Sequence, residues 1–453
     1  MEYPPLTLFE WVKYPVTIGS HPKITDGVLT LPQKFFDILE ECDPKQQIFA
    51  RTTKTLTPIN MVGVIRIGGV TIQILPKLFR DHLNEHKGII SRNLAVMLGY
   101  TNLKPISIDL ASLDQEDLDM LELFLKIFAK QLHHLLFRCQ HRQYLNRDEH
   151  LKFIKGRIQV NKYWNPAQLE RIPCTFKELT QDTLLNRIFK FCATLMSRHT
   201  QNEETKEHLK GILQILEPVT YTHVTSSETR FVILDRLTEQ FAPFLRFCEI
   251  YLRHSTITLQ ASQVEIFSLL IPMERVFEQF ISGVLSEQSH ILPEGTTVYS
   301  QYPGGHLAQT LDGRGIFELR PDIFIDHPRI PVIIDTKYKM PKKSSSNSGV
   351  KQSDIYQMFG YGAKKNVPAL MLLYPDIGEK IDIDLEFSYE NCRLSALLIR
   401  SITLTYDLAD PVQWELWIED LRGIMHDMYE RASHYARVDT SIQVQIYDDM
   451  KSY

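Results

Sequence analysis

The sequence predicts a multidomain protein of mixed α+β and α/β class, with a β-rich N-terminal domain, a helical middle region and a C-terminal domain built on a mixed sheet. At 453 residues the chain is too long to fold around a single hydrophobic core, so it should contain more than one domain. Alternating apolar runs come first, helical spacing follows, and strand and helix patterns interleave toward the C-terminus. We therefore expect domains at 1–108, 109–262 and 263–453.

Composition restricts the class of protein further. The apolar content of 43% is normal for a soluble chain, and neither a run of eighteen apolar residues nor a signal-peptide pattern occurs, so we expect no membrane association. The six cysteines lack a C-x-x-C pair, which argues against a zinc ribbon or a disulfide framework and favours a cytoplasmic location. A net charge of −5 excludes a surface that binds polyanions throughout.

In the N-terminal part, residues 62–78 carry two alternating apolar runs around Gly68 and Gly69, which predicts a hairpin. Such a hairpin either packs into a small barrel or presents a docking edge. Further along, helical spacing over 118–132, 184–195 and 238–252 predicts a helical support.

A basic segment lies inside this middle region. Residues 130–162 hold eight Lys or Arg against two acids. Two interpretations remain open for it, a surface along a phosphate backbone and a solvated helix face with its loop.

Two strand patterns in the C-terminal region, residues 316–325 and 331–338, flank a turn at 326–329. An antiparallel hairpin centred on that turn places Asp322 opposite Asp335 on one face. Two carboxylates so close repel each other, and Mg²⁺, which takes carboxylate oxygens, relieves the repulsion. The alternative is a solvated hairpin.

Lys337 leaves the second strand on the same face as Asp335, where it would hold an attacking water and offset charge on a phosphate. A helix expected downstream, with Ser353 as its N-cap, puts Gln357 and Tyr361 on one face at i, i+4. Together, PD, DTK and Q-x3-Y match the pattern of PD-(D/E)XK nucleases, which have a restriction-endonuclease-like domain.

Residues 272–287 show helical spacing with Glu278 at the edge of the apolar stripe. In nucleases of this superfamily a Glu on the first helix often joins the metal site, and Glu278 is the best match. A boundary residue paired with Arg or Lys is the alternative, and Glu274 and Glu318 are weaker candidates for the metal. The loop after the second strand carries Lys342 and Lys343, which either lie over DNA or belong to an ordinary loop.

Over most of its length the chain resembles the McrC subunits of modification-dependent restriction systems. The matching stretches occur in the family's order: VGVIRIGGVTIQILPKL at 62–78, KGRIQV at 155–160, DTLLNRIFK at 182–190, PMERVFEQF at 272–280, LRPDIFI at 319–325, DTKYK at 335–339 and QMFGYG at 357–362. The resemblance implies a DNA endonuclease subunit that docks onto a hexameric AAA+ GTPase, McrB, and stimulates its nucleotide hydrolysis. A separate motor chain is also expected because this sequence contains no G-x4-G-K-[ST] loop.

Carried over residue by residue, the resemblance assigns Mg²⁺, with Mn²⁺ as an alternative, to Asp322, Asp335 and Glu278. It makes Lys337 the catalytic lysine. The supporting residues would be Gln357 and Tyr361 at the site, Lys339 at a phosphate of double-stranded DNA, and Arg66 with its hairpin at the motor.

Double-strand cleavage would need two copies to meet on DNA. Two other functions stay open: a stand-alone repair or recombination nuclease, and a non-catalytic adaptor that activates an NTPase motor.

Overall fold

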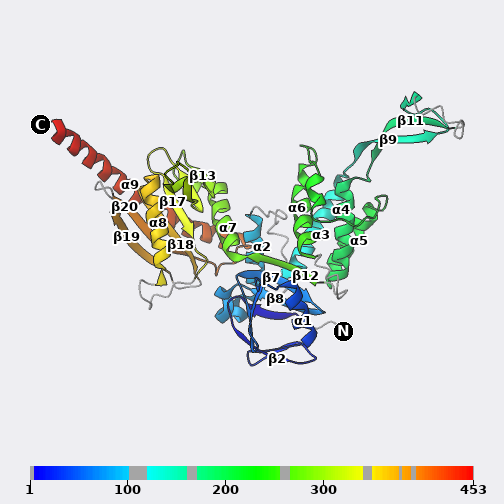
Figure 1. The fold of residues 1–453 in the computed structure, drawn as a ribbon, viewed down its shortest axis with the longest axis horizontal. Helices are drawn as coiled ribbons and strands as arrows, with labels where there is room; N and C mark the ends of the chain where they lie inside the picture. Colours follow the sequence, from blue (N-terminus) through cyan, green and yellow to red (C-terminus); the bar gives the residue numbers. More distant parts are fainter. Residues whose placement is uncertain are drawn as a thin grey trace. The chain divides into compact units, whose positions relative to one another are not determined.

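The computed structural model describes residues 5–101, 120–160, 171–255, 266–339, 349–376, 380–388 and 394–451. The chain forms two compact units. Unit 1 contains Met1–Lys104, Ile108–Leu118 and Thr258–Tyr453, and unit 2 contains Pro105–Ser107 and Asp119–Ile257. Helices and sheets occur in both, as Figure 1 shows, which confirms the predicted multidomain α+β class.

The N-terminal module of unit 1 consists of two sheets with the helix α1 (Gln33–Cys42). A five-stranded sheet has the order β3-β4-β2-β6-β5, and a four-stranded sheet has the order β1-β8-β7-β12. The strands are β1 (Leu6–Phe9), β2 (Tyr14–Ile18), β3 (Lys23–Thr25), β4 (Val28–Leu31), β5 (Phe49–Arg51), β6 (Thr55–Pro58), β7 (Met61–Ile67), β8 (Val70–Leu75) and β12 (Ile266–Pro272). Leu8, Leu29, Phe35, Phe49 and Ile72 form part of one buried cluster, so this module has its own core.

Strands β7 and β8 form the predicted antiparallel hairpin, with Ile67 opposite Val70. Gly68 and Gly69 sit in the turn at φ of 58° and 85°, a left-handed backbone that glycine adopts without a Cβ clash. Both strands pair on their two sides, β8 with β1 and β7 with β12. The hairpin therefore lies inside a four-stranded sheet and does not present the free docking edge that was one of the two expected alternatives.

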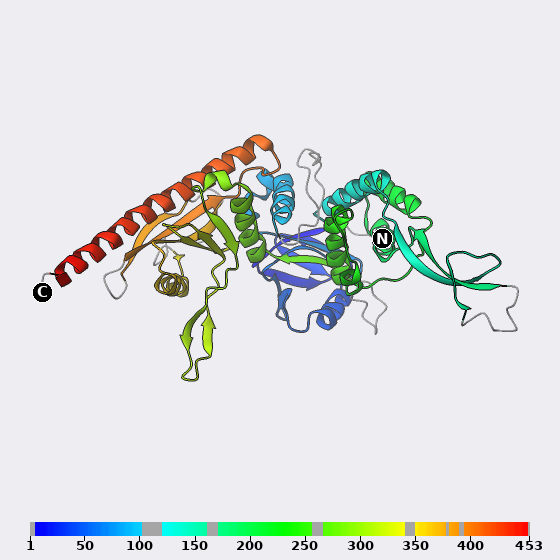
Figure 2. The ribbon, with the colours of Figure 1, turned by 90° about the horizontal axis from the view of Figure 1, so that it is seen from above.

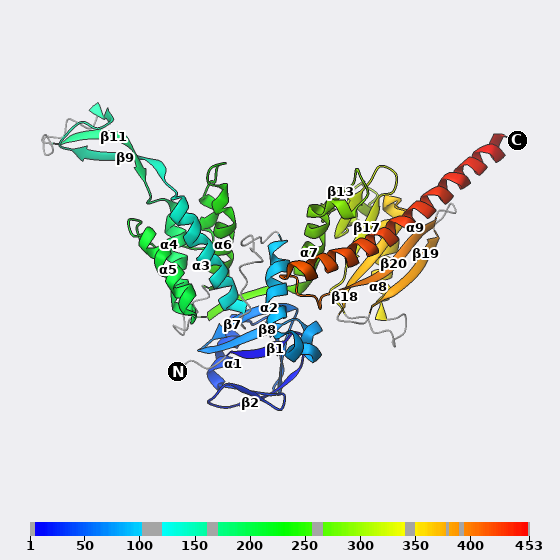
Figure 3. The same cartoon turned by 180° about the vertical axis from the view of Figure 1, so that it is seen from behind.

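The C-terminal module of unit 1 contains a six-stranded mixed sheet of order β13-β16-β17-β18-β20-β19. Its pairs β17·β18 and β18·β20 are parallel and the others antiparallel. The strands are β13 (Thr297–Ser300), β16 (Ile323–Asp326), β17 (Val332–Thr336), β18 (Ala369–Asp376), β19 (Asp382–Ser388) and β20 (Leu394–Thr403). Helix α8 (Gln352–Lys365) covers one face, and the long helix α9 (Pro411–Lys451) crosses the other, as Figures 2 and 3 show.

The strand expected over 316–325 is wrong as a single element. Strand β15 (Gly315–Glu318) instead pairs with β14 (His306–Gln309) in a ribbon of its own, which projects from the module in Figure 2. Phe317 has a φ of 58°, and Pro321 has no N–H to donate, so the backbone cannot continue as a regular strand to Ile323.

The two modules of unit 1 share elements and contacts. Strand β12 belongs to the N-terminal sheet and leads directly into α7 (Met273–Glu287) of the C-terminal module. Helix α2 (Leu83–Gly99) follows the N-terminal sheet, and its Arg92 Nη2 lies 2.6 Å from Asp407 Oδ2. Tyr100 then stacks on Trp414 at 5.6 Å between ring centroids. A strand, an ion pair and an aromatic stack therefore hold the modules together.

Unit 2 combines helices with a three-stranded antiparallel sheet of order β10-β11-β9. The elements are α3 (Met120–Arg138), α4 (Leu184–His199), α5 (Glu203–Ile215), α6 (Ala242–Ser255), β9 (Gln143–Leu151), β10 (Arg157–Ile158) and β11 (Ile172–Thr180). Within the described residues, short 3-10 turns occur at Lys77–His82, Glu228–Phe231, Glu239–Phe241 and Ser289–Ile291.

The helices expected in unit 2 are present, and Thr183 caps α4 by accepting a hydrogen bond from the Asn186 N–H. Over its described residues the basic segment at 130–162 begins in α3 and continues into β9 and β10, so much of the part expected to be a loop forms strands, and its contact with a phosphate backbone stays a prediction. The sequence pattern there alternates too weakly to indicate strands. Among the described residues, we find no helix long and apolar enough to cross a membrane.

Candidate active site

The hairpin of β16 and β17 has the predicted antiparallel register, with Ile323 opposite Ile334. Asp322 comes one residue before this pair and Asp335 one residue after it, so the same register sets the two carboxylates opposite each other. Asp335 is fully buried, and Asp322 is partly buried. An antiparallel ladder thus brings together two acids that lie thirteen positions apart in the chain.

The Asp322 carboxylate is held by groups from the neighbouring strand. Its Oδ2 accepts hydrogen bonds from the Thr336 N–H at 2.8 Å and from the Thr336 hydroxyl at 2.9 Å. Gln301 lies on its other side, with Nε2 3.4 Å from Asp322 Oδ1 and its backbone N–H donating to the Asp322 carbonyl at 2.8 Å. These contacts fix Oδ2 and leave Oδ1 lightly bound.

Lys337 lies beside Asp335, as the sequence predicted. Its Nζ is 2.5 Å from Asp335 Oδ2 and donates a hydrogen bond to Gln357 Oε1 at 3.1 Å. Gln357 in turn approaches Asp335 Oδ1 with its Nε2 at 3.3 Å. The amide of Gln357 therefore bridges the carboxylate and the ammonium group, and it orients both.

Helix α8 supplies this amide, and Tyr361 follows one turn later. The Gln357 Nε2 donates to the Tyr361 hydroxyl at 2.7 Å, which donates to the Arg320 carbonyl at 3.0 Å. The i, i+4 pair is therefore formed. Ser353, however, is not the N-cap: Lys351, with an extended backbone, takes that position, so the helix begins at Gln352, two residues earlier than expected.

Glu278 on α7 completes the group of acids. Its Oε1 accepts a hydrogen bond from Gln301 Nε2 at 2.5 Å, so Gln301 bridges Glu278 and Asp322. Within the described residues this contact is to an amide, not to the Arg or Lys partner that the alternative interpretation required. The sequence analysis did not predict Gln301 as a site residue. It follows β13 with a left-handed φ of 50°, and no local sequence pattern predicts this conformation.

Burial and mutual repulsion dominate the electrostatics of these acids. Burial, followed by the charge of Asp322, raises the pKa of Glu278 to about 7. The same two causes raise the pKa of Asp335, and burial raises that of Asp322 despite its hydrogen bonds to Thr336. Burial alone would lower the pKa of Lys337, but Asp335 and Asp322 raise it overall. Lys337 is thus held in its charged form.

This donor set fits a divalent cation of the Mg²⁺ type. Carboxylates from three elements converge, and oxygen ligands of this kind are those that Mg²⁺ and Mn²⁺ prefer. Asp335 Oδ2 is buried and makes no well-formed hydrogen bond, even though Lys337 lies close to it. Two largely buried acids that face each other and have raised pKa values are a donor set that a divalent cation would neutralise.

Other predicted residues have different surroundings. Lys339 Nζ lies 3.1 Å from Asp354 Oδ2, so its charge is already paired. Glu318 is exposed on the ribbon and pairs with Arg320 at 3.3 Å. Glu274 is exposed on α7, although its charge contributes to the raised pKa of Asp322. The metal candidates therefore reduce to Asp322, Asp335 and Glu278.

Two further predicted elements lie away from these acids or outside the described residues. Arg66 is partly buried in β7, opposite Thr71 of β8 and Phe267 of β12. Lys342 and Lys343 lie outside the described residues.

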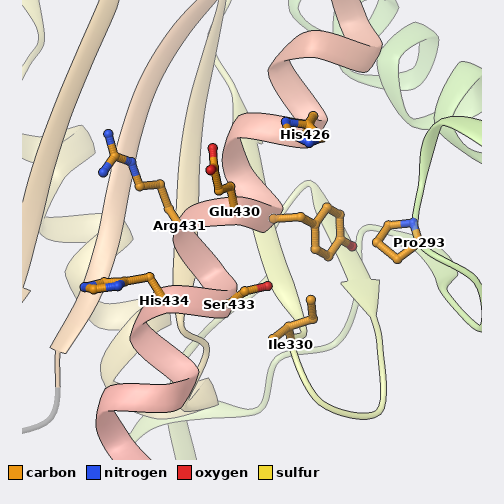
Figure 4. A pocket seen from close by; sticks show the side chains of 8 residues that line it. Pro293, Ile330, His426, Glu430, Arg431, Ser433 and His434 are labelled. Carbon is orange, nitrogen blue, oxygen red and sulfur yellow. The ribbon is translucent and has the colours of Figure 1, made fainter.

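A surface pocket of about 770 Å³ lies along α9, as Figure 4 shows, and contains none of the predicted residues. Its lining is Pro293, Ile330, His426, Tyr429, Glu430, Arg431, Ser433 and His434. Exposed His426, Asp427 and Glu430 are close enough to share an ion, but solvated acids on a helix face commonly have none. The candidate active site is therefore the group of acids at the β16–β17 hairpin and not this pocket.

Fold and site together define a class: a multidomain α+β protein whose C-terminal mixed sheet gathers three carboxylates and a lysine. The chain belongs to the family described as McrBC 5-methylcytosine restriction system component, which it matches over residues 56–375. This confirms the resemblance found in the sequence. A search of the curated proteins gives no match.

Two solved structures from Thermococcus gammatolerans are similar to this chain. One is a half-complex from a tetradecameric assembly of McrB AAA+ hexamers with bound McrC: identity is 19%, coverage is 93% of this chain and 100% of that chain, and the TM-score is 0.67. The other is the McrBC complex: identity is 22%, coverage is 62% of this chain and 87% of that chain, and the TM-score is 0.48. The first likeness supports the fold.

Proposed function

We propose that the chain is the Mg²⁺-dependent DNA endonuclease subunit of a modification-dependent restriction system, and that it works with a McrB-like AAA+ GTPase. The observation that carries the proposal is the convergence of Asp322, Asp335 and Glu278 around Lys337. Acids whose pKa values are raised by burial and repulsion, next to a charged lysine, suit phosphodiester hydrolysis.

In this proposal each residue of the site has its own role in phosphodiester hydrolysis. A divalent cation bound by the three acids would supply Lewis acidity toward a phosphate oxygen. Lys337, held by Gln357, places its positive charge where a phosphate gains negative charge as water adds to phosphorus and the bond to the sugar oxygen breaks. Thr336 and Gln301 keep Asp322 and Glu278 oriented before the substrate arrives. Lys339 would contact the DNA backbone from its place beside Asp354, and Lys342 and Lys343 would assist from the following loop.

The proposed partner is a separate motor, because this sequence has no phosphate-binding loop of its own. Family membership and the fold shared with McrC bound to McrB hexamers support this proposal. We place the docking surface on the N-terminal module near Arg66. Two copies would pair on DNA for double-strand cleavage, and the complex would act in the cytoplasm.

The experiment compares Mg²⁺-dependent cleavage by the wild type, Asp335→Ala and Asp326→Ala, with and without the NTPase encoded beside the gene. Asp326 is an exposed acid at the opposite end of β16, so it is a matched control. We expect cleavage that needs Mg²⁺, the partner and Asp335, with stimulated NTP hydrolysis retained in Asp335→Ala. Cleavage by the chain alone would favour a stand-alone nuclease. Stimulated NTP hydrolysis without any cleavage by the wild type would favour a non-catalytic adaptor.

A further inference from the structure

Tyr338 separates the two lysines that follow β17. Lys337 and Lys339 pair with Asp335 and Asp354, whereas the Tyr338 side chain points to the opposite side, as alternation along an extended backbone requires. It is 3% exposed and packs against Phe277 of α7 at 6.4 Å between ring centroids. Any group that fixes Tyr338 therefore also fixes the backbone from which Lys337 projects.

Two residues of the N-terminal module meet Tyr338. The Lys77 Nζ lies 5.0 Å from the centroid of the Tyr338 ring and 3.5 Å from the Tyr338 carbonyl oxygen. The Lys77 N–H donates to Glu10 Oε1 at 3.2 Å, and the Glu10 carboxylate faces the Tyr338 hydroxyl. Glu10 is fully buried.

The topology of the N-terminal sheet brings this pair to one place. Glu10 follows β1 and Lys77 comes two residues after β8, and these two strands are parallel neighbours with Phe9 opposite Leu75. Parallel neighbours end at the same edge of a sheet, so both residues emerge there, toward the C-terminal module. Because β8 is half of the hairpin with β7, the hairpin ends on the lysine that touches Tyr338.

Retaining charge at this junction is costly. Burial raises the pKa of Glu10 and lowers that of Lys77. The buried Glu10 carboxylate and the buried Tyr338 hydroxyl face each other, and Glu10 Oε2 and this hydroxyl have no other hydrogen-bond partner in the described part of the chain. Apolar side chains would fill such a space with less cost, so a fully buried carboxyl group beside a partly buried lysine indicates that a specific arrangement is required.

We propose that Glu10 and Lys77 are positioning residues for the candidate active site. They clamp Tyr338 from the N-terminal module and thereby set the place of Lys337. This inference rests on the proposed nuclease function. It adds that the N-terminal module is part of the catalytic apparatus as well as a docking platform. A second connection between the N-terminal sheet and the candidate active site supports this proposal: β12 of the same sheet runs directly into α7, which carries Glu278.

The test uses the full chain with its partner NTPase and the variants Lys77→Met, Lys77→Arg and Glu10→Gln. Lys34→Met is the control, because Lys34 is exposed on α1 of the same module. The readouts are single-turnover cleavage at saturating DNA and Mg²⁺, DNA affinity, and hydrogen exchange of a peptide spanning 332–339 in the metal-free protein. Exchange reports the strand end itself and does not depend on cleavage.

We expect Lys77→Met to slow cleavage by about tenfold to a hundredfold, because small displacements of reacting groups have effects of this size. DNA affinity should stay unchanged, and exchange should accelerate in 332–339. Glu10→Gln should also slow cleavage and accelerate exchange in 332–339. Lys77→Arg should recover most of the cleavage rate, and Lys34→Met should behave as the wild type.

Wild-type cleavage and exchange in Lys77→Met would overturn the inference, and so would faster exchange spread evenly over the whole of unit 1. A wild type that never cleaves DNA would instead contradict the proposed function. The exchange comparison would then still decide whether Lys77 holds the strand end.

Discussion

Two aspartates in this chain show how the same side chain acquires opposite properties. Asp182 in unit 2 accepts hydrogen bonds from Arg187 Nε and Nη2, both at 2.7 Å, and from the N–H and hydroxyl of Thr220 at 3.0 and 2.8 Å. Those donors, led by Arg187, hold the pKa of Asp182 well below its usual range. Asp335 in unit 1 is fully buried, faces Asp322, and has its pKa raised.

The difference separates an acid whose charge the fold stabilises from one whose charge the fold disfavours, which is the acid that we propose as a cation ligand. Four hydrogen bonds satisfy Asp182, and each favours its charged form. Asp335 has the Lys337 ammonium 2.5 Å from its Oδ2, but it also faces Asp322 and is fully buried, so its charged form is disfavoured in the metal-free chain, and a cation at the proposed site would stabilise it. Substitutions at the two positions should therefore change activity and stability in opposite ways.

The largest effect is expected for Asp335→Asn, which should slow Mg²⁺-dependent DNA cleavage by about a thousandfold, because an amide is a poorer cation ligand and does not hold Lys337. Single-turnover cleavage with the partner NTPase measures this loss. Asp182→Asn, assayed below its melting temperature, should retain at least half of the wild-type rate. Equal losses in the two variants would mean that Asp335 acts only through the fold.

The effects on stability should be reversed. Asp182→Asn should lower the free energy of unfolding of unit 2 by about 2–3 kcal/mol, because it removes charge-assisted hydrogen bonds. Asp335→Asn should raise the stability of the metal-free chain by about 1 kcal/mol, since burial and the repulsion from Asp322, which together raise the pKa of Asp335, outweigh its attraction to Lys337. Urea unfolding followed by circular dichroism compares them. A metal-free Asp335→Asn that is less stable than wild type would contradict this account.

Mg²⁺ should stabilise the wild type by about 1.4 kcal/mol at ten times its dissociation constant, because it binds the folded chain and not the unfolded one. Asp335→Asn should gain nothing measurable, whereas Asp182→Asn should gain as much as the wild type. Melting curves in MgCl2, compared with KCl at the same ionic strength, provide the measurement. The same gain in all three proteins would place the bound cation elsewhere.

The smallest effect concerns pH. Because folding raises the pKa of Glu278 from 4.5 to about 7, the folded metal-free chain binds more protons than the unfolded chain in that interval, and its stability should fall as pH rises through it. Glu278→Gln should flatten this slope. Asp182 contributes the opposite sign, since its lowered pKa gives stability that is lost as pH falls toward the acid range. Melting temperatures of the metal-free proteins from pH 4 to pH 8 test the sign for Glu278, and a series below pH 4 tests the sign for Asp182; a Glu278→Gln slope equal to the wild type would refute the assignment.

Local patterns in the sequence were enough for much of the fold and the candidate site. The glycine pair at 68–69 specifies the turn between β7 and β8. The turn at 326–329 sets the strand register that places Asp322 opposite Asp335. Spacing of i, i+4 places Gln357 beside Tyr361. Each of these depends on residues close in the chain, where backbone geometry alone decides which side chains meet.

Tertiary structure decided what pairs over long distances. The pairing of β12 with β7 joins segments about two hundred positions apart, and the sequence of neither strand indicates which strand it pairs with. Gln301 became a bridge between Glu278 and Asp322 only when β13 was placed next to β16. Likewise, the contact of Lys77 with Tyr338 exists because two modules pack together. The sequence by itself determined the chemistry of the site, since that chemistry resides in residue types and short spacings. Which groups hold that site in place depended on the packing of distant segments.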